Sequence, residues 1–126
     1  MNIMKKNILS FDEIVSKVAA LGVPGLILVI AMGATGFAGA AAITTALAAI
    51  GPGGIVGGLV ILGIVGIVTE ALTKYGYKAI VKGVLKELVK RGETKETILN
   101  KIEKYHISKS LKLQLKEEVN KLFEDE

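Results

Sequence analysis

Apolar residues occur in this chain in two patterns: one long uninterrupted run, and shorter segments in which apolar and charged positions recur with helical spacing. Between Val18 and Thr69 there is no Asp, Glu, Lys, Arg or His. A surface helix of a soluble protein keeps a polar face, and this run offers only scattered threonines. The pattern predicts an all-α protein whose apolar half lies in a membrane.

The apolar run contains one strong turn signal. Residues 51–54 read Gly-Pro-Gly-Gly, which removes a backbone donor and permits positive φ. Leu26–Ile50 and Ile55–Thr73 flank this turn, and each is close to or above the length of about 20 residues that crosses a bilayer. We therefore predict a transmembrane helical hairpin, rich in Gly and Ala, over residues 23–73 with its turn at 51–54. Whether residues 23–50 form one helix or two is left open.

The segment before the hairpin has a different character. Pro24-Gly25 disfavours a helix that continues from Leu21, so residues 1–22 are predicted to form a separate amphipathic segment with a short helix over 10–22. Lysines precede the hairpin and follow it, whereas its turn carries no charge. The positive-inside rule then predicts a multi-pass membrane protein with both termini in the cytoplasm.

The apolar run has two other interpretations. The first is a soluble protein with a very apolar central hairpin, although the remaining chain is short for covering two such helices. The second is a cleavable signal peptide, but Asp12 and Glu13 lie where a signal peptide lacks acids. The run also continues well beyond any plausible cleavage site. Both interpretations are weaker than the membrane hairpin.

Small residues recur within the run at spacings that let helices approach closely. In lipid, helix association relies on such small-residue ridges because the hydrophobic effect does not drive it. The ridges predict contacts within the hairpin or between copies, and hence a homo-oligomer. The predicted helix-packing residues are Gly33, Gly36, Gly39, Gly53, Gly54, Gly57 and Gly58.

A ladder of lysines follows the hairpin in residues 74–92. Five lysines lie four residues apart, and apolar residues occupy the opposite arc of the predicted helix, which Gly92 would terminate. Like charges at this spacing repel one another, and anionic lipid headgroups would supply counter-charge. The other interpretation is a solvated helix face; nucleic acid is not expected, because no aromatic residues are interleaved. The predicted headgroup-binding residues are Lys74, Lys78, Lys82, Lys86 and Lys90.

Residues 93–126 form the predicted cytoplasmic tail. Apolar stripes indicate two helices, over 94–104 and 109–123, with Ser108 as a cap of the second. Each helix buries little alone, so we expect them to pack on each other and on the basic helix. A soluble protein is the other candidate partner for this tail.

The sequence offers little catalytic chemistry. It contains no Cys and a single histidine, His106, so a thiolate site or a two-histidine metal site cannot form within one chain. We expect no catalytic residues, no metal and no cofactor, and hence not an enzyme. Glu70 is the acid nearest the predicted bilayer boundary, and Lys74 one turn later is expected to pair with it. The net charge of +4 lies mostly in the lysine ladder.

Two motifs carry a resemblance to a known family. The stretch Ala-Met-Gly-Ala-Thr-Gly-Phe-Ala-Gly-Ala-Ala-Ala at 31–42 is followed by Gly-Pro-Gly-Gly-Ile-Val-Gly-Gly at 51–58. Over about residues 31–68 the chain resembles the interferon-inducible small glycine/alanine-rich membrane proteins and their bacterial relatives. The resemblance implies a multi-helix membrane protein tied to stress, immunity or membrane permeability. The charged half from Lys74 onward departs from that pattern.

Together these patterns predict a small integral membrane protein that self-associates and acts on membrane integrity, as an effector or pore-former of the stress, defence or toxin type. The alternative is a non-catalytic membrane anchor or scaffold whose helical tail recruits a soluble partner.

Overall fold

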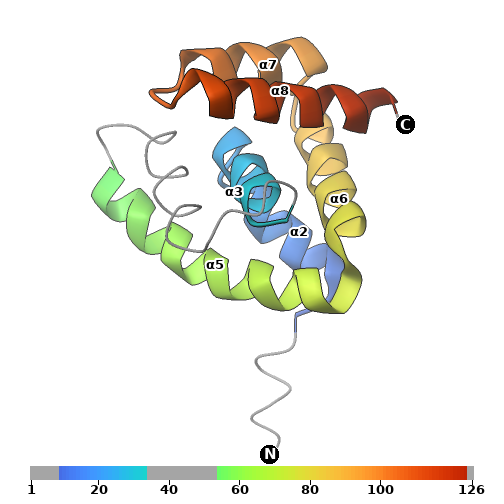
Figure 1. The fold of residues 1–126 in the computed structure, drawn as a ribbon. Coiled ribbons are helices and arrows are strands. Elements are labelled where there is room, and N and C mark those ends of the chain that lie inside the picture. The colour runs from blue at the N-terminus through green and yellow to red at the C-terminus, as the bar shows by residue number, and fades with distance from the viewer. Residues whose placement is uncertain (1–8, 34–53, 125–126) are drawn as a thin grey trace, which may run out of the picture.

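The computed structural model describes residues 9–33 and 54–124, with side chains described from residue 63 onward in the second range. These residues form helices and no strand, so the all-α prediction is confirmed for the described part of the chain. The helices, labelled in Figure 1, are α2 (Phe11–Ala19), α3 (Val23–Gly33), α5 (Gly54–Tyr75), α6 (Tyr77–Lys90), α7 (Lys95–Lys104) and α8 (Lys109–Glu124).

Helix α3 lies at the centre of the fold (Figure 1). It contacts α2, α5, α6, α7 and α8. The six consecutive side chains from Leu26 to Ala31 are all 0% exposed. Successive residues of a helix point about 100° apart, so burial of six in a row means that α3 is covered on every side. The other helices therefore cover α3, whereas the expectation of too short a cover concerned two longer apolar helices, and most of the first of these lies outside the described residues.

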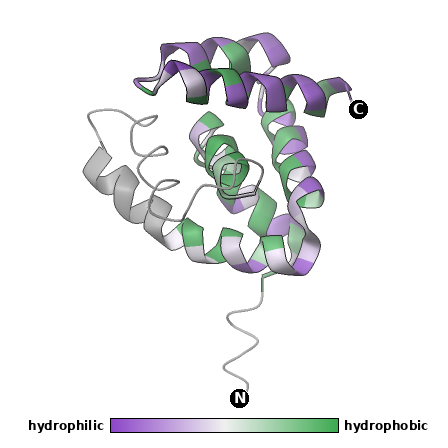
Figure 2. Cartoon of the chain, in the orientation of Figure 1, coloured by the Kyte–Doolittle hydropathy of each residue, from purple (hydrophilic) through white to green (hydrophobic). Residues whose placement is uncertain are grey.

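Four of the covering helices, α2, α6, α7 and α8, are amphipathic and bury their apolar residues. Figure 2 shows α3 almost wholly hydrophobic and α6, α7 and α8 divided between hydrophobic and hydrophilic positions. The predicted apolar face of α6 is confirmed, since Ile80, Val81, Val84, Leu85 and Leu88 are buried. The predicted stripe of α8 is confirmed as well: Leu111, Leu115, Val119 and Leu122 are buried.

The segment before α3 follows the sequence prediction closely. Ser10 caps α2 in a reciprocal capping box with Glu13, with nitrogen–oxygen distances of 3.0 and 3.1 Å. The helix ends at Ala19, and α2 and α3 meet at a bend of 118°. Pro24 lies in the first turn of α3, where a missing N–H removes no helix hydrogen bond. The separate short helix predicted over 10–22 is confirmed.

The junction of α5 and α6 corrects a prediction. A basic helix was expected over 74–92, but Lys74 belongs to the last turn of α5, and α6 begins only at Tyr77. Between them Gly76 has a φ of +88°, a conformation that glycine adopts without the steric cost of a Cβ. The chain therefore changes direction at Gly76.

The described residues only partly cover the predicted hairpin. Most of its first arm and residues 51–53 of its turn lie outside the described residues, and Gly54 begins α5. Within the described chain, no single helix combines the length and the apolar character needed to cross a membrane; α2 and α3 do so only as a bent pair.

The link between α6 and α7 is stabilised by backbone hydrogen bonds. The Glu93 N–H donates to the Leu88 carbonyl and the Gly92 N–H donates to the Val89 carbonyl, each at 3.0 Å. This arrangement is a Schellman motif, which satisfies the carbonyls at the end of a helix. The prediction that Gly92 ends the basic helix is confirmed.

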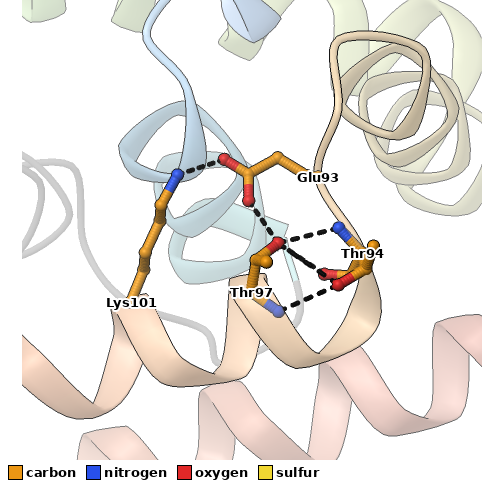
Figure 3. Close-up of polar contacts among 4 residues, drawn as sticks. All are labelled: Glu93, Thr94, Thr97 and Lys101. Carbon is orange, nitrogen blue, oxygen red and sulfur yellow. Dashed lines mark hydrogen bonds and ion pairs between the residues drawn. The ribbon is translucent and has the colours of Figure 1, made fainter.

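Directly after this link in the chain, a cluster of polar side chains lies at the start of α7 (Figure 3). Thr94 caps the helix, with the Thr97 N–H donating to its hydroxyl at 3.1 Å. The Glu93 carboxylate accepts hydrogen bonds from the Thr97 hydroxyl and the Lys101 ammonium. Burial raises the pKa of Glu93, but these hydrogen bonds and the Lys101 charge together outweigh it, so that the pKa lies below its ordinary value of 4.5.

Helices α7 and α8 pack on each other, as predicted, and Ser108 caps α8 by accepting from the Leu111 N–H at 3.2 Å. They were also predicted to pack on the basic helix, and α8 does contact α6 through the hydrogen bond from Tyr77 to Glu118. Both helices contact α3 as well, which was not predicted. The tail is therefore part of the cover of the central helix.

Helices α2 and α3 cross so closely that only glycine fits at residue 25. A Cβ added to Gly25 would lie 2.1 Å from the Val18 carbonyl oxygen, which belongs to the backbone and cannot move aside cheaply. A Cβ on Gly63 in α5 would meet nothing within 4 Å. An alanine side chain at residue 25 would therefore overlap the backbone of α2, whereas one at residue 63 would meet open space.

We expect Gly25→Ala to lower the free energy of unfolding by about 1–3 kcal/mol, because it overpacks the crossing of α2 and α3. Gly63→Ala, the matched control, should raise it by up to about 1 kcal/mol, because alanine is the better helix former. Denaturant titration followed by circular dichroism measures both. Equal effects of the two substitutions would show that the crossing is not tight.

Glu93 makes stability depend on pH. Since its folded pKa is depressed, its contribution is fully present above about 4.5 and is lost as the pH falls through the lower, folded value. We expect the melting temperature of the wild-type chain to fall more steeply below pH 4.5 than that of Glu93→Gln. Parallel curves for the two proteins would contradict the role given to this carboxylate.

Candidate functional site

The lysines of α6 form one continuous basic face. Lys78, Lys86 and Lys90 are exposed and Lys82 is half-buried, on the side of the helix opposite the core-facing residues. Val89, 46% exposed, lies on the same side. A helix face that combines lysines with exposed apolar surface is typical of helices that lie on membranes. We call Lys78, Lys82, Lys86 and Lys90 the α6 basic face.

The fifth predicted lysine lies beyond the helix break. The Lys74 ammonium is 5.3 Å from the centroid of the Tyr75 ring, within the range of a cation–π contact. Tyr75 in turn packs edge-on against Phe11, with the ring centroids 5.2 Å apart. The expected ion pair of Lys74 with Glu70 is not formed; both side chains are exposed. Lys74 therefore belongs to α5 and does not share the helix of the α6 basic face.

No acidic side chain neutralises the α6 basic face among the described residues. None of its four lysines has a carboxylate within ion-pair distance there. The acid of the same helix, Glu87, pairs with Arg91 at 3.1 Å, and Arg91 also donates to the Ser16 hydroxyl at 3.3 Å. Glu87 is thus held at the edge toward α2, away from the lysines.

Within the described residues, two lysines of α8, unlike those of the α6 basic face, pair with a carboxylate. Glu103 pairs with Lys116 at 3.2 Å and with Lys112 at 4.0 Å, and its backbone carbonyl accepts a further hydrogen bond from Lys112 at 2.6 Å. Lys109 and Leu113 lie beside this group, and Leu113 is 64% exposed. Two clusters of lysine therefore coexist in one molecule, one with counter-charge and one without.

Of the predicted packing glycines, only Gly33 has surroundings that the structure describes. A Cβ on Gly33, at the end of α3, would lie 2.2 Å from Cδ1 of Tyr77, so this glycine does permit a close contact, with an aromatic ring. Gly36, Gly39 and Gly53 lie outside the described residues. Gly54, Gly57 and Gly58 lie within α5, in the part whose side-chain surroundings are not described. Their role in packing stays a prediction.

Two close helix contacts were missed by the sequence reasoning. Gly25 permits the crossing of α2 and α3, and Gly83 faces Val15 and Phe11 of α2, with its added Cβ 2.8 Å from Val15. Gly83 carried a readable signal, because an isolated glycine within a helical pattern often has a packing reason. Gly25 was attributed to the helix break instead.

Tyr77 is a further residue that the sequence did not single out. Its hydroxyl donates to the Glu118 carboxylate of α8 at 3.0 Å, while its ring lies on Gly33. Burial, and then the hydrogen bond and charge of Glu118, hold the pKa of Tyr77 above its ordinary value. Tyr77 thus joins the start of α6, the end of α3 and the middle of α8.

The described residues contain no group of three or more His, Asp or Glu side chains placed to hold a metal ion. His106 is exposed in the loop between α7 and α8, and the neighbouring Ser108 hydroxyl is engaged as the cap of α8. Comparisons with protein-family models, with curated proteins and with solved structures gave no match to this chain.

Because the lysines of the α6 basic face repel one another, we expect removal of their charge to raise the stability of the fold. Lys82→Gln with Lys86→Gln removes all three like-charge contacts at i,i+4 within α6. We expect this double substitution to raise the free energy of unfolding by about 0.5–1 kcal/mol at low salt, and less at high salt. Arg91→Gln, the control, should lower it, because Arg91 has partners. Chemical denaturation at two salt concentrations tests this, and a loss of stability in the double variant would reveal a counter-charge.

Proposed function

We propose that this protein is a membrane-active effector that binds anionic lipid through the α6 basic face and transfers its enclosed apolar helices into the bilayer as a self-associated assembly. One observation carries the proposal: an all-apolar helix, buried on every side, shares a chain with a basic face that lacks counter-charge among the described residues. Such a protein would act on membrane integrity, as an effector of the stress, defence or toxin type.

The electrostatic part of the proposal follows from the lysines. A lysine close to an anionic leaflet contributes about 1 kcal/mol to binding. The α6 basic face can present four such charges together, and Val89 adds apolar surface between them. Binding to headgroups would also relieve the mutual repulsion of these lysines.

The apolar part of the proposal follows from α3. Leu26 to Ala31 carry no polar side chain, and in water they need the full cover of the other helices. In hydrocarbon the same side chains need no cover, because lipid tails are as apolar as leucine. Helix α3 spans 11 residues, which is short of a bilayer crossing, so insertion involves the apolar run beyond Gly33.

Self-association is supported by the outer face of α5. Gly63 and Gly66 are exposed, and an added Cβ at either would meet nothing within 4 Å. The Thr69 and Thr73 hydroxyls donate to backbone carbonyls one turn earlier, at 2.8 and 3.1 Å. A face of small residues whose hydroxyls are already satisfied suits close contact with a second helix in lipid.

The second candidate is an anchor whose tail recruits a soluble partner. Leu113, the most exposed large apolar side chain described, favours it because it lies on α8 beside lysines that a protein partner could contact. The tail also covers α3, however, and a recruitment module would need no such cover. We therefore place the anchor second.

Vesicle binding and dye release test the proposal. The wild-type chain should bind vesicles of phosphatidylglycerol and phosphatidylcholine and release an enclosed dye, with little effect on phosphatidylcholine alone. The variant K78Q/K82Q/K86Q should lose at least about tenfold in vesicle affinity, because three lysines contribute about 1 kcal/mol each. Its control, K109Q/K112Q/K116Q, makes the same change in net charge at lysines of the tail and should lose much less.

Three outcomes decide against parts of this account. Equal losses in the two triple variants would show that net charge alone governs binding. Stable binding without dye release would favour the anchor. No binding to anionic vesicles at all would remove the proposed function.

A further inference from the structure

We infer that the α7–α8 pair is an autoinhibitory cover over α3, held closed by the hydrogen bond from Tyr77 to Glu118. The inference rests on the proposed function, because covering α3 inhibits only if α3 acts by leaving the fold. It reverses the expected role of the tail: residues 93–126 restrain the apolar helix and are not a free recruitment arm.

The α7–α8 pair lies against one side of α3. Both α7 and α8 contact α3, and they lie together on one side of it (Figure 1). Their buried residues include Ile98, Ile102, Leu115 and Val119, each 0% exposed. On the other sides α3 is covered by α2, α5 and α6, which also contact one another. Removing α7 and α8 would therefore uncover one side of α3 and leave the rest of its cover in place.

Few polar contacts join the α7–α8 pair to the other described helices. Within the described chain, the side-chain hydrogen bonds and ion pairs of α8 stay inside the α7–α8 unit, except the bond from Tyr77 to Glu118. Apart from the contacts of Glu103 with α8, those of α7 involve Glu93 and Thr94 at its own start (Figure 3). One hydrogen bond thus supplements the apolar contacts with α3.

Tyr77 lies where α3, α6 and α8 meet. It is the first residue of α6, directly after Gly76, and its ring packs on Gly33, the last residue of α3. Beyond Gly33 lies the rest of the apolar run. The same side chain therefore touches the end of the helix to be released, the bend between α5 and α6, and the cover. Loss of its bond to Glu118 would free the cover and leave the ring on Gly33 in place.

Thiol labelling tests the cover in water, independently of any membrane. The chain has no cysteine, so a single introduced cysteine is the only thiol. Ile27, Leu28, Val29 and Ile30 point in four different directions from α3 and are all 0% exposed. Each is replaced by cysteine in turn, with Tyr77 intact and with Tyr77→Phe, and the rate of reaction with a thiol reagent is compared within each pair.

We expect Tyr77→Phe to raise the labelling rate about tenfold or more at the positions that face α7 and α8, the usual effect of losing a hydrogen bond to a charged group. Positions that face α2, α5 and α6 should change little. Tyr77→Phe keeps the ring on Gly33, so a change in labelling rate reports the loss of the hydroxyl alone. Tyr75→Phe is the matched control, because it makes the same chemical change two residues earlier, at a tyrosine whose hydroxyl has no hydrogen bond to the described residues.

Glu118→Ala provides the test from the other side of the bond. It should reproduce the Tyr77→Phe pattern, and the double variant should label no faster than the faster single variant. No acceleration in either single variant, or equal acceleration at all four positions, would overturn the inference, because the bond would then hold no cover or would hold the entire fold.

Dye release from anionic vesicles separates this inference from the proposed function. If Tyr77→Phe releases dye at a lower protein concentration than the wild type and Tyr75→Phe does not, both stand. If labelling rises as expected but no variant binds vesicles, the α7–α8 pair opens as inferred and the proposed function fails. If the wild type releases dye and Tyr77→Phe neither labels nor leaks faster, the cover fails and the proposed function stands.

Discussion

The structure depends on one constraint: a helix without a polar face must be hidden from water. From Leu26 to Ala31 every side chain of α3 is apolar and fully buried. Each of the other helices can be understood as one way of meeting that requirement, because α2, α5, α6, α7 and α8 all contact α3. The close crossing at Gly25 brings α2 near enough to exclude water, and the turn at Gly76 lets α5 and α6 cover different sides.

The same constraint connects the fold to the proposed function. Amphipathic helices that hide an apolar helix must place their polar residues outside, and in α6 those residues are lysines without acidic partners among the described residues. A molecule built this way has a reason to approach an anionic bilayer and a buried helix that hydrocarbon would accept without cover. The proposal and the role of Tyr77 both follow from this pairing of a charged exterior with an apolar centre.

Sequence reasoning succeeded where local signals are strong. The separate short helix before α3, the end of α6 at Gly92, the two helices after it and the apolar faces of α6 and α8 all follow from spacing and helix-breaking residues. It failed where the arrangement of the helices depends on tertiary contacts. Periodicity cannot show that Gly76 interrupts the basic helix, that α7 and α8 pack on α3, or that Tyr77 reaches Glu118 from 41 residues away. The family resemblance rests on residues 31–68, most of which lie outside the described chain.

The central claim is that α3 moves from the protein interior into lipid, and quenching of a tryptophan by brominated lipid tests it most directly. The chain has no tryptophan, so Met32→Trp, at a half-buried position near the end of α3, provides a single reporter. On anionic vesicles the account predicts strong quenching by bromine deep in the acyl chains, and much weaker quenching when Lys78, Lys82 and Lys86 are replaced by glutamine. A tryptophan that stays as shielded on the vesicle as in solution would contradict the account.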